Sequence, residues 1–502
     1  MKDTAFTQQS GERRASRRSS TLAVLLLFVI FVSGTVHAQV PDRKSPPALG
    51  PTPSLTLPSI QRFQLSNGLP VVIMEKHNVP VVQVNLLVNA GSAMDVGSKS
   101  GLASLAADMM DEGAGQRDAL GLADAIDFLG ASIWTSAGMH TSSVALHTPL
   151  SKIDQALPLM ADIAIHPTFP AAELERKRKE RLTTLLQWFD EPRAIASVLF
   201  NRTLFGAQHP YGVPTLGSEK SIRGFTVEDM RAFHSLFFHA GNATLVVVGD
   251  VVPQTILPKL ESAFGSWPRK PVSKLSWARP KQVQRRQIYL VDKPGAAQSE
   301  IRIGRIGAER LTEDYFPLIV MNTILGGSFT SRLNQNLREQ HGYTYGASSS
   351  FVFWPLPGPF LAASAVQTAV TDKALTEFMN ELKRILEPPS DEELTRAKNY
   401  LALRYPRSFQ TASQIAGQLG EIVTYNLPDD YINTYVQRVL SVTKKDVVRV
   451  AKKYLDPEAV AIIIVGDRKV IEKSLRDLNL GPLNNLSIED VLGKPPVVES
   501  KN

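Results

Sequence analysis

One strand-forming pattern occurs twice in this sequence, and the repeat limits the folds that the chain can adopt. Residues 242–252 read NATLVVVGDVV, and residues 458–470 read EAVAIIIVGDRKV, each after a helical segment. The two Val-Gly-Asp triplets in these segments lie 217 positions apart. The same shift carries the first strand-like region, near residue 65, close to the strand-like run 288–292. A duplicated structural unit accounts for both correspondences.

Strand-like and helix-like segments follow one another in a mixed order within the first copy. Apolar runs at 63–72 and 80–88, near the turn-prone Asn67-Gly68 and His77-Asn78, predict a pair of strands. The other segments expected from apolar spacing are helices at 102–110, 119–129, 151–165 and 171–189 and strands within 131–147 and 243–248. This order predicts an α+β fold rather than a strict alternation of strands and helices.

Changes in composition divide the chain into segments. The stretch 266–286 is rich in Pro, Lys and Arg and has little apolar periodicity, so we interpret it as a linker between two halves. The expected segments are a signal peptide at 1–38, a Pro-rich tether at 39–59, an N-terminal half at 60–265, the linker at 266–286, a C-terminal half at 287–480 and a flexible tail at 481–502.

The first residues have the layout of an export signal. An arginine-rich stretch precedes the apolar run 22–32, which is followed by small residues up to Ala38. Eleven apolar residues are short for a membrane span, which needs about twenty. We therefore expect cleavage after Ala38, a periplasmic or extracellular location and no integral membrane domain afterwards, with a membrane tether if the signal is not cleaved.

Charge and cysteine content exclude several functions. The formal net charge of +7 includes the arginines near the N-terminus, and basic residues elsewhere alternate with acids, as in 173–181. That alternation favours a solvated helix face over a nucleic-acid interface. The chain has no cysteine, which excludes disulfides, thiolate nucleophiles and sulfur-ligated metals.

Several motifs, taken in order, resemble the insulinase/pitrilysin metallopeptidases, and particularly their bacterial and mitochondrial-processing-peptidase branch. They are LSNGLPVVI at 65–73, AGSAMD at 90–95, KSGLASLAADMMDEGA at 99–114, HPYGVPTLG at 209–217, NATLVVVGDV at 242–251 and LGGSFTSRLNQNLREQHGYTYG at 325–346. The resemblance implies two homologous α+β halves that enclose a peptide chamber, alone or with a partner.

Active members of that family carry His-x-x-Glu-His on one helix. Two histidines four residues apart share a helix face and bind zinc, while the intervening Glu activates the zinc-bound water. The corresponding positions here are Ser104, Ala107 and Asp108, so both histidines and the catalytic Glu are replaced. The third ligand, a Glu in the family, falls in the window 185–187, which reads Leu-Leu-Gln. No two of the nine histidines are four residues apart, so we expect no metal site in this chain.

Two family positions in the second half are retained. Arg338 and Tyr345 match the Arg and Tyr with which family members hold the substrate backbone near the scissile bond. The alternative is structural, with Arg338 paired to Glu339 or Glu313 and Tyr345 packed in a strand. The turn 326–329 is shorter than the glycine-rich loop of noncatalytic mitochondrial subunits, and its default interpretation is a tight turn between helices.

The resemblance leads to one main hypothesis. The chain would be a catalytically inactive subunit without a cofactor of its own, which binds peptide substrate beside an active homologous partner that carries the zinc. Two alternatives remain open: an active metallopeptidase with unusual ligands, and a stand-alone peptide-binding or chaperone-like protein of the cell envelope.

Overall fold

The computed structural model describes residues 56–95, 99–272 and 276–497, which belong to one contact unit, Thr52–Asn502. The expected signal peptide and most of the expected tether, 39–59, lie outside these residues. Among the helices of the described part, none is long and apolar enough to cross a membrane.

The N-terminal half is built on a six-stranded mixed sheet with the order β1-β2-β8-β3-β7-β6. Its strands are β1 (Gln61–Gln64), β2 (Pro70–Glu75), β3 (Val81–Val88), β6 (Ser132–Ala137), β7 (Ser142–Pro149) and β8 (Ala243–Gly249). β1 and β2 form a hairpin around Asn67-Gly68, which divides the strand-like run expected at 63–72. The expected pairing of β2 with β3 is wrong, because β8 lies between them, parallel to β2 and antiparallel to β3.

The C-terminal half repeats this topology. Its sheet has the order β11-β12-β10-β13-β9-β14, with β9 (Gln287–Asp292), β10 (Gln298–Ile306), β11 (Ala347–Phe353), β12 (Pro357–Gln367), β13 (Ala461–Gly466) and β14 (Leu483–Leu486). β13 takes the place of β8, between β9 and β10, just as β8 lies between β2 and β3. The two halves therefore share one strand order, as the repeat predicted.

Helices cover the sheets. Those of the N-terminal half are α2 (Leu102–Met110), α3 (Ala119–Phe128), α4 (Ile153–Ile165), α5 (Ala171–Trp188), α6 (Pro192–Phe205), α7 (Glu219–Gly224), α8 (Val227–Phe237) and α9 (Pro253–Phe264). Those of the C-terminal half are α10 (Tyr315–Leu325), α11 (Arg332–Asn334), α12 (Thr371–Arg384), α13 (Asp391–Arg404), α14 (Ala412–Tyr425), α15 (Tyr431–Ser441), α16 (Lys444–Tyr454), α17 (Arg468–Asp477) and α18 (Ile488–Leu492). The four helices expected in the first half are all present as α2, α3, α4 and α5.

The expected flexible tail, 481–502, is wrong over much of its length. β14 pairs in parallel with β9 and so closes the sheet edge that β1 closes in the other half. α18 follows, and its Val491 is buried. Arg202 of α6 donates hydrogen bonds to the carbonyl oxygens of Asp490 and Val491, at 2.9 and 3.1 Å. Residues 483–492 are ordered because they cover an open strand edge and bury an apolar side chain.

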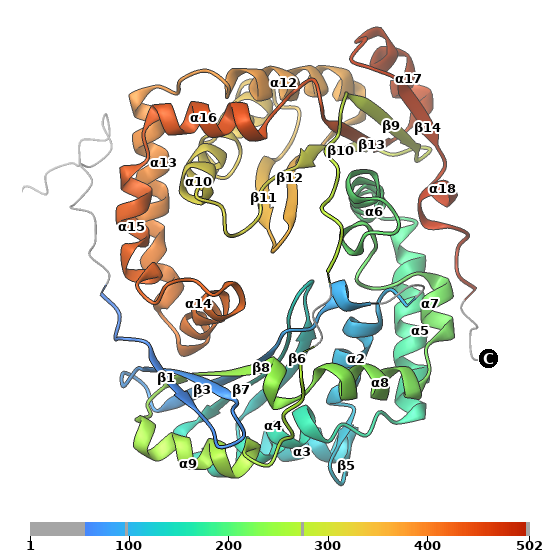
Figure 1. Cartoon of the computed structure of the whole chain (residues 1–502). Coiled ribbons are helices and arrows are strands. Elements are labelled where there is room, and N and C mark those ends of the chain that lie inside the picture. Colours follow the sequence, from blue (N-terminus) through green and yellow to red (C-terminus); the bar gives the residue numbers. More distant parts are fainter. Residues whose placement is uncertain (1–55, 96–98, 273–275, 498–502) are drawn as a thin grey trace, which may run out of the picture. The chain divides into compact units, whose positions relative to one another are not determined.

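The halves exchange helices across their sheets (Figure 1). α6 of the first half packs on β10 and β13 of the second, while α14 of the second half packs on β3 and β8 of the first. The buried contact of α14 joins Ile415 and Leu419 to Val72 and Val246. Each exchanged helix covers only the central strands, so the edge strands β6 and β11 lie beyond it.

Candidate functional site

Helix α2 corresponds to the zinc-binding helix of the resembled family. It begins after Gly101, whose φ of +90° is costly for residues with a side chain. The carboxylate of Asp95 accepts hydrogen bonds from the N–H groups of Gly101 and Ala103, at 2.7 and 2.8 Å, and thereby caps the helix. Burial raises the pKa of Asp95 to about 7, against these N–H groups and the nearby Arg181, which favour the ionised form.

The replaced positions on α2 are engaged in protein contacts. The Ser104 hydroxyl donates to the carbonyl oxygen of Thr215 at 2.8 Å. Ala107 is buried, and its carbonyl oxygen accepts a hydrogen bond from the Thr135 hydroxyl of β6 at 2.7 Å. Asp108 forms an ion pair with Arg181 of α5. These contacts fix α2 against its neighbours. Positions 104 and 108 carry no imidazole, and position 107 carries no carboxylate.

Arg181 is the residue of this site that the sequence did not single out. The alternating charges of 173–181 predicted a solvated face, yet the Arg181 residue is only 5% exposed. Its Nη2 lies 2.5 Å from Oδ2 of Asp108, and its Nη1 donates to the carbonyl oxygens of Leu216 and Gly101 at 3.0 and 3.3 Å. A fixed positive charge therefore joins α2 to α5, the two helices that carry the zinc ligands in active relatives of the resembled family.

The window of the third ligand holds no carboxylate. Leu185 is buried, while Leu186 is 40% exposed and Gln187 is exposed. Within the described ranges, no group of three His, Asp or Glu side chains is arranged to hold a metal ion. A catalytic zinc ion needs about three protein ligands and one open position. The residues present at α2 and α5 do not fit such an ion, and the guanidinium of Arg181 would repel it.

The edge strand β6 lies beside this helix. It is the last strand of its sheet and packs against α2, to which Thr135 is hydrogen-bonded. Its side chains alternate between exposed and half-buried, and Trp134 is 42% exposed. An edge strand offers one row of backbone N–H and C=O groups to another extended chain. The replaced catalytic position thus lies next to a sheet edge that can accept a strand.

Arg338 and Tyr345 lie in the second half, before β11. Arg338 belongs to a π-helical turn, Gln335–Gln340, and its guanidinium carbon lies 4.4 Å from the ring centre of Phe329. Its Nε is 3.5 Å from Oε1 of Glu339, so the ion pair forms with Glu339 and not with Glu313. Tyr345 is 91% exposed and does not pack in a strand. Both side chains can be reached from solvent, while their role in holding peptide stays a prediction.

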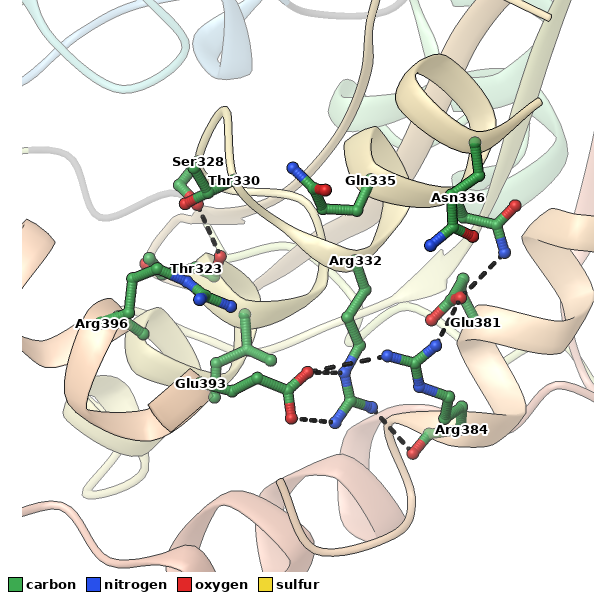
Figure 2. A pocket seen from close by; sticks show the side chains of 13 residues that line it. Thr323, Ser328, Thr330, Arg332, Gln335, Asn336, Glu381, Arg384, Glu393 and Arg396 are labelled. Carbon is green, nitrogen blue, oxygen red and sulfur yellow. Dashed lines mark hydrogen bonds and ion pairs between the residues drawn. The ribbon is translucent and has the colours of Figure 1, made fainter. Parts of the chain in front are cut away.

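The turn 326–329 joins α10 to α11, as expected. Figure 2 shows the polar pocket beside it, in which Arg332 forms two hydrogen bonds with the Glu393 carboxylate, at 2.7 and 3.0 Å, and one with the Arg384 carbonyl oxygen. Burial opposes the ionisation of Glu393, but hydrogen bonds from Arg332 and from the backbone of Ser390 outweigh it and lower its pKa to about 2. This network fixes α11 against its neighbours, while the turn itself is held by hydrogen bonds from the N–H groups of Gly326 and Gly327 to the carbonyl oxygen of Asn322.

The duplicated halves and the altered helix α2 together define a protein with a zinc-peptidase fold whose metal site lacks its ligands. Residues 70–211 match the family model for insulinase (peptidase family M16), and residues 224–401 match the model for the peptidase M16 inactive domain. The chain therefore belongs to the M16 peptidase family, as the motifs indicated.

Curated relatives of this chain carry two kinds of description. A protein of Rickettsia bellii described as an uncharacterized zinc protease is 24% identical over 80% of this chain and 96% of its own length. A protein of Helicobacter pylori described as the non-peptidase homolog YmxG is 22% identical over 80% of this chain and 92% of its own. Membership of the family thus extends to proteins described as non-peptidases.

A solved structure supports the same assignment. The crystal structure of a peptidase M16 inactive domain from Pseudomonas fluorescens has a TM-score of 0.76 and 27% identity, and the alignment covers 81% of this chain and 97% of that one. A protease from Helicobacter pylori, at 21% identity and a TM-score of 0.75, shares the fold. The present chain is an M16 peptidase homologue without the zinc-binding residues of the family.

Proposed function

We propose that this protein is the noncatalytic subunit of an exported M16 peptidase complex, in which it binds extended peptide beside an active, zinc-bearing homologue. One observation carries the proposal. The edge strand β6, which can accept a peptide strand, packs against helix α2, in which Ser104, Ala107 and Asp108 stand at the positions of the family's zinc ligands and catalytic Glu. Binding by backbone hydrogen bonds does not need a metal, so it can outlast the loss of catalysis.

Arg338 and Tyr345 support the binding role. Tyr345 is 91% exposed, so it gains little stability from packing within the chain. Its position near an arginine that also matches the family favours a contact with another molecule. The stacking of Arg338 on Phe329 orders a side chain that would otherwise be mobile in solvent. We propose that these two side chains hold the backbone of the bound peptide.

A partner is required for the peptide to be cut. Since Arg181 fills the space between α2 and α5 with a positive charge, the zinc and the catalytic Glu must come from another chain. The N-terminal run 22–32 supports export of this chain, so the partner would be a periplasmic or extracellular protein. A homologue with His-x-x-Glu-His on its own equivalent of α2 meets these needs.

Co-purification from the native host, followed by peptide binding, tests the proposal. We expect a stoichiometric partner with an intact zinc motif, and we expect Arg338→Ala to weaken peptide binding by the assembled pair about tenfold or more. Arg231→Ala is the matched control, because it removes an equally charged, exposed arginine that pairs with exposed Glu228 and donates to the carbonyl oxygen of Thr168. Unchanged affinity in Arg338→Ala would remove that residue from the binding role.

The same purification separates the two alternatives. An isolated chain that binds peptide without a partner identifies a stand-alone envelope binding protein. An isolated chain that contains stoichiometric zinc and cleaves unstructured peptides identifies an active peptidase and contradicts the proposal.

A further inference from the structure

A cavity of about 900 Å³ lies beside the degenerate helix α2. Its volume falls within the range of about 300 to 1,000 Å³ that is usual for ligand pockets. Leu185, at the window of the lost third ligand, forms part of its wall, as do Asp95 and Ser100 at the start of α2. The cavity therefore adjoins the altered site.

The walls of the cavity are mainly apolar. Three half-buried aromatic side chains form part of this surface: Trp188 and Phe189 at the end of α5, and Trp277. Met94 and Val213 add further apolar area. Half-exposed aromatic rings around a hollow are suited to another aromatic ring, because edge-to-face and offset contacts add to the gain from burial.

Three charged groups of the wall, Asp95, Arg202 and Glu219, are engaged in contacts within the protein, and Lys220 and Lys494 line it as well. Arg202 donates both its terminal nitrogens to the carbonyl oxygens of Asp490 and Val491. Glu219 forms an ion pair with Arg223, which lies one turn further along α7. Besides its apolar surface, the described wall therefore carries two basic side chains, Lys220 and Lys494, while its carboxylates are engaged within the protein.

The cavity is completed by segments from outside the N-terminal half. Trp277 belongs to the linker, Leu492 is the last residue of α18, and Pro496 belongs to the segment after α18. Arg223 of α7 donates to the carbonyl oxygen of Val497 at 2.8 Å and holds this segment against the N-terminal half. We name residues 493–497 the strap. Both the linker and the strap thus contribute to the shape of the cavity.

The loop between the cavity and α2 connects them directly. The carbonyl oxygen of Thr215 accepts the Ser104 hydroxyl, and that of Leu216 accepts Nη1 of Arg181. Val213 and Pro214 of the same loop line the cavity. α2 therefore contacts both this loop, through Ser104, and the strand β6, through Ala107 and Thr135.

We propose that this cavity binds large apolar side chains, aromatic ones above all, of a peptide held by the protein. The inference rests on the peptide-binding function proposed above and names the class of peptide: extended segments with an aromatic residue. Because burial of an aromatic ring is favourable, we expect a preference of about tenfold or more over serine, which corresponds to about 1.4 kcal/mol.

Two probes test the cavity and the peptide function separately. The first is a pair of otherwise identical extended peptides with Phe or Ser at the central position, titrated against the full chain. The second is N-acetyl-4-fluorophenylalaninamide, observed by fluorine NMR. This probe is a single blocked residue, so its binding reports on the cavity without a peptide strand. We expect the Phe peptide to bind about tenfold more tightly than the Ser peptide, and the amide resonance to broaden on addition of protein.

Val213→Trp should fill the cavity and abolish both the preference and the broadening. Val79→Trp places the same side chain at a 55% exposed position away from the cavity and should leave both unchanged. If Val213→Trp fails to fold, a chain that ends at Leu492 removes the strap but keeps β14 and α18, and it should weaken the preference with an unaltered circular dichroism spectrum.

The outcomes are distinct. If peptides bind without a preference for Phe, or if Val213→Trp keeps the preference, the inference is overturned. If the amide binds and neither peptide does, the cavity is upheld as an aromatic site while the peptide function fails. If a long-chain fatty acid displaces the amide and the peptides remain indistinguishable, the cavity belongs to a lipid and the inference is overturned.

Discussion

Replacement of Arg181 by methionine tests whether a guanidinium has taken over the junction between α2 and α5. The side chain makes one ion pair with Asp108 and donates to two carbonyl oxygens, of Leu216 and Gly101. Methionine keeps the apolar stem and removes the charge and all five donors. The variant therefore isolates the polar contribution of Arg181.

The magnitude follows from what each partner loses. The Asp108 side chain is 46% exposed, so water can solvate it and its pairing contributes no more than about 1 kcal/mol. The Gly101 oxygen still accepts the N–H of Leu105, whereas the Leu216 oxygen loses its donor at a cost of about 1–3 kcal/mol. We expect Arg181→Met to lower the free energy of unfolding by about 1–4 kcal/mol in total.

Urea unfolding at neutral pH, followed by circular dichroism in low and high salt, measures this loss. In a double-mutant cycle with Asp108→Asn, the coupling energy should be about 1 kcal/mol or less and should shrink in high salt, because the pair is half-exposed. A loss below about 0.5 kcal/mol would refute the view that Arg181 holds the two helices together.

Three further perturbations give graded outcomes. Burial lowers the pKa of His140 from 6.5 to about 4, so stability present above pH 6.5 should be lost as the pH falls toward 4, by up to about 3 kcal/mol, and His140→Gln should abolish this loss in urea titrations across that range. Glu393→Gln should cost about 2 kcal/mol at neutral pH, and the difference from the parent should shrink as the pH falls from 4.5 toward 2, because its carboxylate is held ionised by Arg332. A chain that ends at Leu480 should lose at least about 2 kcal/mol of stability in thermal unfolding, because β9 loses its edge partner and the buried Val491 is removed.

The sequence predicted which segments form strands and helices better than it predicted which strands pair with one another. The apolar run 243–248 predicted a buried strand, and β8 is one. Its pairing with β2 and β3 was not predicted, because more than 150 residues separate β8 from them in the sequence. Local periodicity carries no information on such pairing. The repeat did carry it, because two halves with one plan must share one strand order.

The residues that were missed look ordinary in the sequence. Arg181 lies in a run of alternating charges, and nothing in that pattern distinguishes a buried arginine from its solvated neighbours. Residues 481–486 contain Gly, Pro and two Asn, which predict a turn or tail, whereas the open edge of β9 recruits them as a strand. In both cases a tertiary partner outweighed the local preference. The replacement of the zinc ligands and the catalytic Glu by Ser104, Ala107 and Asp108, in contrast, could be predicted by aligning the family motif with this sequence.

The measurement closest to the central claim is the zinc content of the purified full chain, with its activity on an unstructured peptide, before and after incubation with zinc. We expect no more than trace metal, no cleavage, and no gain of either on incubation, because Arg181 and Asp108 form an ion pair and the described residues hold no group of three side chains arranged to bind a metal ion. One zinc ion per chain between α2 and α5, together with turnover of the peptide, would contradict it.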